Sequence, residues 1–319
     1  MKCWLFTLAL ILSTSLATAA ESWPQLSGDA LRSGNAAEAT LPAKLGLVGA
    51  VPTTDGIYTS PVIADGTVYV VDSDNARVQV YNRSGQFLQQ WGTFGNRPGQ
   101  FASPVGIAVD GAGNVLVADS ANHRIQVFSG TGEWLRGWGS EGIGDGQFRE
   151  PSGVAVDASG HVYVADMLNH RVQKFQGDGT FVTKWGTHGT GSGQFVEPNG
   201  IAVAANGDVY VADTENQRIQ QFTSGGAFIR AWGRPGSSNE AFDGPQGLSV
   251  GPDGTVYVAD TFNHRIQAFR GDGAFLRAWG TFGANDGQLY EPGSVTIDSD
   301  GNVYVADTWN HRIQVFRPD

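Results

Sequence analysis

The stretch "VADSANHRIQVF", residues 117–128, decides the fold, because almost the same letters return as "VADTWNHRIQVF" at residues 305–316. The aspartate of this stretch recurs every 47 residues from Asp72 to Asp307, and a tryptophan recurs at the same interval from Trp91 to Trp279. A fixed period of this length is typical of stacked supersecondary units. The chain is therefore expected to consist of one unit written six times.

Each unit spells four short strands. In the second unit the strand-like runs are "VGIAVD" at 105–110, "VLVAD" at 115–119, "HRIQVF" at 123–128 and "WLRGWG" at 134–139. Runs rich in β-branched and aromatic residues, separated by turns of Gly, Asp and Asn, predict antiparallel strands joined by hairpins. Four strands in a repeat of this length form the blade of a β-propeller. The predicted fold is an all-β, six-bladed propeller of four-stranded antiparallel blades.

The last unit stops at "RIQVFRPD" and lacks a fourth strand, which would leave an open sheet edge. The missing strand is expected at the other end of the chain. Val48 precedes Pro61 by 13 residues, and Trp91 precedes Pro104 by the same 13 residues. We therefore predict that "KLGLVG", residues 44–49, completes the last blade and closes the ring.

The first residues resemble a secretory signal peptide. An early lysine, an apolar run and the small residues Ala17-Thr18-Ala19 predict cleavage after Ala19, with a retained membrane anchor as the alternative. The chain then divides into a signal peptide (1–19), an N-terminal arm (20–43) and the propeller (44–319). The mature protein is expected to be secreted or periplasmic, monomeric and without a membrane span.

Composition argues against two kinds of chemistry. Cys3 is the single cysteine, so the mature chain would have neither disulfides nor thiolate chemistry. The formal charge is −11, and it becomes −12 when Lys2 is removed with the signal peptide. Such an acidic protein repels phosphate backbones, so nucleic acid is not an expected partner.

The repeated words resemble the NHL-repeat family. They read P-x-G-I-A-V-D, N-V-Y-V-A-D, N-H-R-I-Q-V-F and G-x-F-L-R-x-W-G, and they cover residues 58–319. The resemblance implies the propeller fold and leaves the function open, because the family includes RNA-binding ubiquitin-ligase domains, a metal-dependent amidating lyase, receptor sensor domains and secreted proteins.

Residues present in every unit are expected to build the scaffold. An Asp ends each second strand and an Arg begins each third strand, five residues later, where the two form a charge-assisted pair across the hairpin, single or bidentate. The Asn of each turn is expected to adopt the left-handed conformation. The turn histidines are His123, His170, His264 and His311. Neighbouring turns should lie on the order of 14 Å apart in a propeller, too far to share a zinc ion, so no metal site is predicted.

Function is sought where the copies differ, on the face that carries both the second hairpin turns and the long connectors after each Trp-Gly. Large apolar residues there mark a contact surface, with packing on neighbouring connectors as the alternative. The residues predicted to bind a partner are Phe94, Glu141, Met167, Leu168, His188, Phe262, Phe282 and Trp309.

The connectors are also acidic, with nine carboxylates against three arginines and thus a formal charge of −6. This charge would suit a cationic ligand or calcium, with solvated surface charge as the alternative. We expect a non-catalytic module that docks a protein, peptide or glycan, without a cofactor.

The competing hypothesis is a metal-dependent enzyme, either a zinc lyase or a calcium lactonase-like hydrolase. The resemblance implies that the lyase of the family binds zinc through histidines just after the repeat's proline. The residues in those slots are Val62, Val105, Ser152, Asn199, Gln246 and Gly293.

Overall fold

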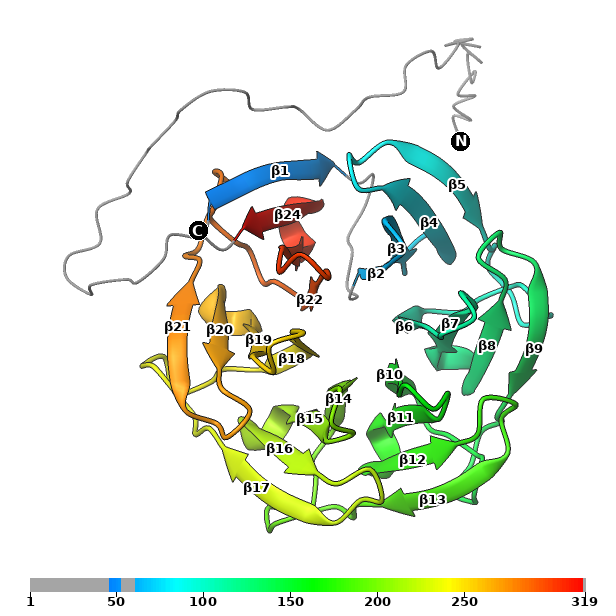
Figure 1. The fold of residues 1–319 in the computed structure, drawn as a ribbon. Helices are drawn as coiled ribbons and strands as arrows, with labels where there is room; N and C mark the ends of the chain where they lie inside the picture. Colours follow the sequence, from blue (N-terminus) through cyan, green and yellow to red (C-terminus); the bar gives the residue numbers. More distant parts are fainter. Residues whose placement is uncertain (1–45, 53–60, 318–319) are drawn as a thin grey trace, which may run out of the picture.

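The structure, a computed structural model, describes residues 46–52 and 61–317, and of 46–52 it describes the backbone alone. The predicted signal peptide (1–19) and N-terminal arm (20–43) lie outside these residues. Six four-stranded antiparallel sheets are arranged around a central axis (Figure 1), so the predicted six-bladed propeller is confirmed. Among the described residues, every helix is a single 3-10 turn and none has the length or hydropathy of a membrane span.

The first strand of each blade lies closest to the axis (Figure 1). These strands are β2 (Val62–Ala64), β6 (Pro104–Val109), β10 (Pro151–Val156), β14 (Pro198–Val203), β18 (Pro245–Val250) and β22 (Ser294–Ile297). The second strands are β3 (Thr67–Asp72), β7 (Val115–Asp119), β11 (Val162–Asp166), β15 (Val209–Asp213), β19 (Val256–Asp260) and β23 (Val303–Asp307). In the second blade both agree with the sequence prediction to within one residue.

The third strands are β4 (Arg77–Asn82), β8 (Arg124–Phe128), β12 (Arg171–Phe175), β16 (Arg218–Phe222), β20 (Arg265–Phe269) and β24 (Arg312–Arg317). The outer strands are β5 (Phe87–Trp91), β9 (Trp134–Trp138), β13 (Phe181–Trp185), β17 (Phe228–Trp232), β21 (Phe275–Trp279) and β1 (Gly46–Pro52). Five 3-10 turns connect second and third strands: η1 (Ser120–Asn122), η2 (Met167–Asn169), η3 (Thr214–Asn216), η4 (Thr261–Asn263) and η5 (Thr308–Asn310).

The sixth blade contains strands from both ends of the chain. β1 pairs antiparallel with β24 from Gly46↔Arg317 to Pro52↔Arg312, with a shift of register between Leu47 and Gly49, and it occupies the outer position of that sheet (Figure 1). Of the expected strand 44–49, residues 44 and 45 lie outside the described residues, and the strand continues past residue 49 to Pro52. Its backbone covers the edge of β24 that the chain would otherwise expose.

The hydrophobic core consists of the interfaces between neighbouring blades. The strand "VYVAD" is buried at all five positions in blades 3 to 6, because its side chains alternate between two blade faces that are both covered. The tryptophan that ends an outer strand packs toward the next blade: the ring centroids of Trp91 and Phe128 are 5.9 Å apart. The recurring tryptophans are therefore packing residues between blades.

Candidate functional site

The second hairpin turn of each blade is built around a buried carboxylate. Asp119 is fully buried and accepts hydrogen bonds from Arg124 Nε at 2.7 Å, Asn122 Nδ2 at 2.9 Å and Gln126 Nε2 at 3.0 Å. It also accepts the backbone N–H of Ala102, in the preceding connector, at 2.7 Å. The Asp–Arg pair is thus confirmed, with a single guanidinium nitrogen on the carboxylate. The aspartates with the same set of donor types are Asp166, Asp213, Asp260 and Asp307.

The left-handed residue of this turn follows the asparagine, so the prediction for Asn was wrong. Asn122 belongs to the 3-10 turn η1, and its side-chain amide donates to the carboxylate of Asp119 and to the carbonyl of Gly95 at 2.8 Å. The next residue ends the turn with a positive φ, which is 54° at His123. The residues in this position are Ala76, His123, His170, Gln217, His264 and His311.

The turn histidines connect neighbouring blades. His123 Nδ1 accepts the backbone N–H of Glu150, which precedes the first strand of the next blade, at 3.2 Å. In the fourth blade Gln217 Oε1 accepts the N–H of Gly244 in the same way at 2.7 Å. A ring nitrogen that accepts a hydrogen bond carries no proton, so the imidazole is neutral with its proton on Nε2. The other two pairs of this kind are His170 with Glu197 and His264 with Glu291.

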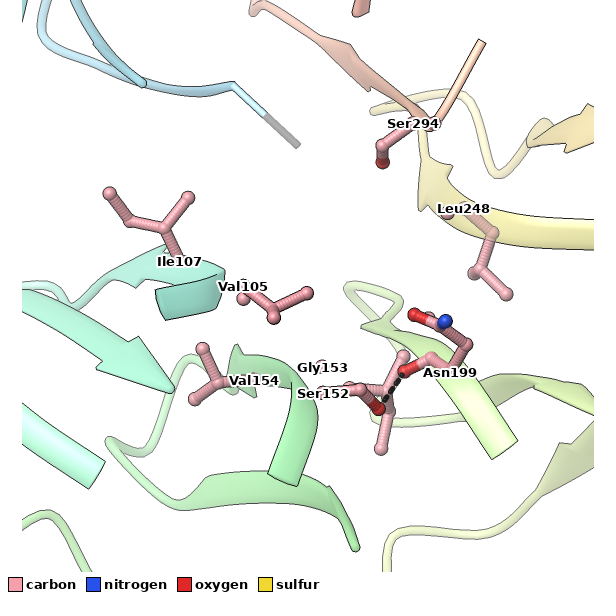
Figure 2. Close-up of a pocket in the computed structure, with 13 residues that line it drawn as sticks. Val105, Ile107, Ser152, Gly153, Val154, Asn199, Leu248 and Ser294 are labelled. Carbon is pink, nitrogen blue, oxygen red and sulfur yellow. Dashed lines mark hydrogen bonds between the residues drawn. The ribbon is translucent and has the colours of Figure 1, made fainter. Parts of the chain in front are cut away.

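Around the central channel, the first strands of neighbouring blades approach one another closely at glycines. A Cβ at Gly106 would clash with the carbonyl oxygen of Ser152, and a Cβ at Gly153 would clash with that of Asn199. The cavity of about 40 Å³ at this level has room for roughly three water molecules. Figure 2 shows its aliphatic lining, including Val105, and the hydroxyl of Ser152, which donates to the carbonyl of Asn199 at 3.1 Å. In the part of the chain that is described, no three His, Cys, Asp or Glu residues converge as a metal site.

The long connectors place one variable residue each on the loop face. Each connector folds back on itself through a bridge between the third residue after the Trp and a buried aromatic or aliphatic residue seven positions later. Phe94 is 79% exposed and Phe282 is 61% exposed, so a large apolar side chain here contacts solvent. The bridges are Phe94↔Phe101, Glu141↔Phe148, His188↔Phe195, Pro235↔Phe242 and Phe282↔Leu289.

A second variable position lies in the middle of each 3-10 turn. The backbone N–H of this middle residue donates to a backbone carbonyl near the end of the preceding connector. In the sixth blade the N–H of Trp309 donates to the carbonyl oxygen of Tyr290 at 3.2 Å. Leu168, Phe262 and Trp309 occupy this position and are 38%, 51% and 46% exposed. Met167 begins η2 and is half-buried.

Four variable positions therefore meet between successive blades, and we call this place an inter-blade notch. Its first member is the left-handed residue of one blade. The next two lie in the connector that follows: the third residue after the Trp, and the residue whose carbonyl accepts the N–H of the next 3-10 turn. The fourth is the middle residue of that 3-10 turn. Notch 1 is formed by Ala76, Phe94, Ala102 and Ala121, notch 2 by His123, Glu141, Arg149 and Leu168, notch 3 by His170, His188, Val196 and Glu215, notch 4 by Gln217, Pro235, Asp243 and Phe262, and notch 5 by His264, Phe282, Tyr290 and Trp309.

Notch 5 is aromatic at all four positions. The ring centroids of His264 and Phe282 are 4.9 Å apart, those of Phe282 and Tyr290 are 5.1 Å apart, and those of Tyr290 and Trp309 are 6.2 Å apart. Of the predicted binding residues, Phe282 and Trp309 share notch 5, and Glu141 and Leu168 share notch 2. Sequence reasoning missed Tyr290 and His264, although the contrast of Tyr290 with the Ala, Arg, Val and Asp at the same place in the other connectors is visible in the sequence.

Notch 3 contains a pair of histidines. The ring centroids of His170 and His188 are 4.6 Å apart. Burial, and after it the nearby His188, lowers the pKa of His170 below its ordinary value. The remaining predicted residues, Phe94 and Glu141, belong to notches 1 and 2. Ile143, which the sequence analysis also missed, is 72% exposed in the connector of notch 2.

Comparison with known proteins identifies the repeats and the fold. The NHL repeat family model matches residues 101–128, 148–175, 195–222, 242–269 and 289–316. No curated protein matches the chain in sequence.

Three solved structures illustrate the likeness. Virginiamycin B lyase from Staphylococcus aureus is 14% identical, with a TM-score of 0.62 over 87% of this chain and 100% of that chain. A protein of unknown function from Bacteroides thetaiotaomicron is 15% identical, with a TM-score of 0.63 over 88% of this chain and 73% of that chain. The WD40 propeller domain of Doa1 is 12% identical, with a TM-score of 0.59 over 86% of this chain and 97% of that chain. At these identities the likeness shows the fold alone.

Proposed function

Because this chain is a six-bladed β-propeller that carries NHL repeats, we propose that it is a non-catalytic binding protein whose loop face docks a protein, peptide or glycan. The observation that carries the proposal is the exposure of large apolar residues on that face, where Phe94, Phe282 and Trp309 are 79%, 61% and 46% exposed. Solvent-exposed aromatic side chains on loops of a rigid scaffold are typical of interaction surfaces.

The polar groups near the axis support a binding role over a catalytic one. The recurring Asp, Asn and Arg of the turns donate and accept within the scaffold, and the turn histidines bind backbone N–H groups. The residues that face the channel are small or aliphatic for the most part, and the hydroxyl of Ser152 is hydrogen-bonded to backbone. These groups hold the ring together and are not poised for proton transfer.

A binding screen with matched variants tests the proposal. The full chain is immobilised and probed with a random peptide library and a glycan array, beside a loop-face variant in which Phe94, Phe282 and Trp309 are replaced by Ser. A rim variant, with Ser at Leu88, Leu135 and Leu276 of the outer strands, controls for the loss of exposed apolar area. We expect ligands that bind the wild type and the rim variant and not the loop-face variant. Equal binding by all three proteins, or no ligand at all, would contradict the proposal.

The alternative is a metal-dependent lyase or lactonase-like hydrolase; one enzyme named as a lyase, virginiamycin B lyase, has the same fold. Elemental analysis of the purified mature protein by mass spectrometry separates the two hypotheses. Stoichiometric zinc or calcium would favour the enzyme, and its absence would favour the binding protein.

We also propose that the protein acts as a monomer outside the cytoplasm, secreted or periplasmic, since the first 19 residues have the composition of a signal peptide. N-terminal sequencing of the mature protein should begin at Ala20. An N-terminus at Met1 would favour the retained anchor.

A further inference from the structure

The aromatic notch between blades 5 and 6 is the feature in which one copy departs furthest from the others. Every described notch has the same backbone, yet notch 1 has alanine at three of its four positions and a single aromatic residue, Phe94, and notches 2, 3 and 4 are mixed polar and apolar. Four aromatic rings are not needed to stabilise the fold, because the other notches form without them. We propose that notch 5 binds a cationic side chain, arginine or lysine, of a basic peptide segment. This inference rests on the binding function proposed above.

The aromatic residues of notch 5 offer ring surface to a ligand. Phe282 is 61% exposed and Trp309 is 46% exposed, whereas Tyr290 is half-buried and contacts both rings. A cation is attracted to the faces of Trp, Tyr and Phe by the ring quadrupole, and Arg also stacks on such faces. Phe282, Tyr290 and Trp309 thus supply one each of the three ring types that attract cations.

The angles between the rings favour a cation over a sugar. The planes of Phe282 and Tyr290 are inclined at 78°, those of His264 and Tyr290 at 78°, and those of His264 and Phe282 at 50°. A pyranose ring stacks on the face of one aromatic ring. The rings of this notch do not extend such a face into one flat surface, since even the pair nearest to parallel, Tyr290 and Trp309, is inclined at 34°. A compact positive group needs no such plane, because its attraction to each ring is electrostatic.

The charges around the notch also favour a cation. The connector from Thr281 to Glu291 contains Asp286 and Glu291 and neither Lys nor Arg, and the side chain of Asp286 is 70% exposed. The neighbouring connector adds Glu240 and Asp243 against Arg234. This excess of carboxylates attracts a positive ligand and repels phosphate or sulfate.

The arginines of the adjoining turns offset this potential only in part. Arg265 Nε lies 2.7 Å from the buried Asp260. Arg312 Nε lies 2.7 Å from the buried Asp307 and Arg312 Nη1 lies 3.9 Å from Asp286 Oδ1, so one arginine faces two carboxylates and the three groups together keep a net negative charge. His264 Nδ1 accepts the N–H of Glu291 at 3.1 Å, which requires the neutral ring. The four members of notch 5 therefore present aromatic ring faces next to an excess of carboxylates, and none of the four members carries a positive charge.

Isothermal titration of the full chain with two short peptides tests the inference. The probes are N-acetylated, C-amidated peptides of alternating Gly and Arg, or alternating Gly and Gln. At low salt the Arg peptide should bind at least tenfold more tightly than the Gln peptide. Phe282→Leu and Trp309→Leu should each weaken binding of the Arg peptide about fivefold, because leucine keeps the apolar contact and removes the ring face. Asp286→Asn should weaken it about twofold.

Two controls distinguish the notch from the acidic face as a whole. Phe87→Leu replaces a 48% exposed aromatic on outer strand β5 and should leave the affinity for the Arg peptide unchanged. Phe282→Tyr, which keeps the ring face, should restore most of the affinity lost in Phe282→Leu. The inference is overturned if the two peptides bind equally, or if binding of the Arg peptide responds to salt and not to Phe282→Leu and Trp309→Leu.

The result also separates this inference from the proposed function. If the Arg peptide fails while peptides or glycans from the screen bind the wild type and not the loop-face variant, the cationic specificity is wrong and the docking function stands. If an oligosaccharide binds and loses affinity in Trp309→Leu, notch 5 is a sugar site. If none of these probes binds, both proposals fail.

Discussion

Replacement of Asp213 by Ala should destabilise the propeller by about 4 kcal/mol. The carboxylate is fully buried and accepts Arg218 Nε at 2.7 Å, Gln220 Nε2 at 2.9 Å, Asn216 Nδ2 at 3.0 Å and the backbone N–H of Val196 at 2.8 Å. Removal of one partner from a buried charge pair costs about 3–5 kcal/mol, because the other partner keeps its charge without compensation. In a domain of this size such a loss lowers Tm on the order of 10 °C.

The matched control is an ion pair of similar length on the surface. Lys184 Nζ lies 2.5 Å from Asp145 Oδ1, with the two side chains 44% and 50% exposed, so Asp145→Ala should cost less than about 1 kcal/mol. Asp213→Asn keeps the size of the side chain and an acceptor oxygen, and should cost about 2 kcal/mol. Urea unfolding followed by tryptophan fluorescence gives the three values. If Asp213→Ala and Asp145→Ala shift the midpoint equally, the turn network does not stabilise the ring and the reasoning is refuted.

Three further predictions test the scaffold. Deletion of 46–52 should expose the edge of β24 and cause aggregation, seen by light scattering; unchanged solubility and Tm would show that β1 does not stabilise the ring. Burial lowers the pKa of His170 in the folded protein, so the unfolded chain binds a proton more readily and stability should fall as the pH drops below the unfolded-state pKa of about 6.5. His170→Gln, which copies Gln217 of the next blade, should show a smaller loss of Tm between pH 7.5 and pH 5 than the wild type. An equal loss of Tm in both proteins would contradict this. Gly226→Ala, whose Cβ would lie 2.5 Å from the indole ring of Trp185 in the preceding blade, should cost about 3 kcal/mol in urea unfolding. Gly207→Ala, at nearly the same φ and with only an ordinary contact to Ser224 Cβ at 3.9 Å, should cost about 1 kcal/mol; equal costs would rule out the ring contact.

The blades could be predicted from the sequence because each depends on local patterns repeated six times. Alternating apolar residues, Gly-rich turns and the fixed interval of Asp119 and Trp138 specify strands, hairpins and period together. The conformation of the second turn could not be predicted in the same way. It depends on a 3-10 turn whose asparagine is held by the buried carboxylate, so the positive φ moves to the following residue, which is His123 in blade 2. The sequence prediction relied on the tolerance of asparagine for the left-handed conformation. It did not include the hydrogen bond from Asn122 to the buried carboxylate of Asp119, which holds the asparagine inside the 3-10 turn.

The candidate site was predicted in part for a related reason. Exposure of Phe282 and Trp309 follows from their places in a connector and a turn, which the repeat alignment supplies. The contribution of Tyr290 depends on contacts between residues of different blades, and an aromatic residue next to a buried leucine is more often part of a core. Only the ring distances, 5.1 Å to Phe282 and 6.2 Å to Trp309, show that Tyr290 belongs to this aromatic cluster.

The six copies within one chain also provide a comparison that separates stability from function. His264 and His123 each accept a backbone N–H from the next blade, and Gln217 does the same. This hydrogen bond explains why a polar acceptor recurs at the left-handed position of the turn. It gives no reason for aromatic residues around that position. The three aromatic residues around His264 require a different cause. A role in folding would predict that notch 1, with alanine at three of its four positions, is less well formed, yet its connector makes the same bridge, Phe94↔Phe101, as the connector of notch 5. The aromatic residues of notch 5 are therefore better explained by a ligand than by the fold. Phe282→Leu and Trp309→Leu test this directly, because they remove the ring faces and should weaken binding of the Arg peptide.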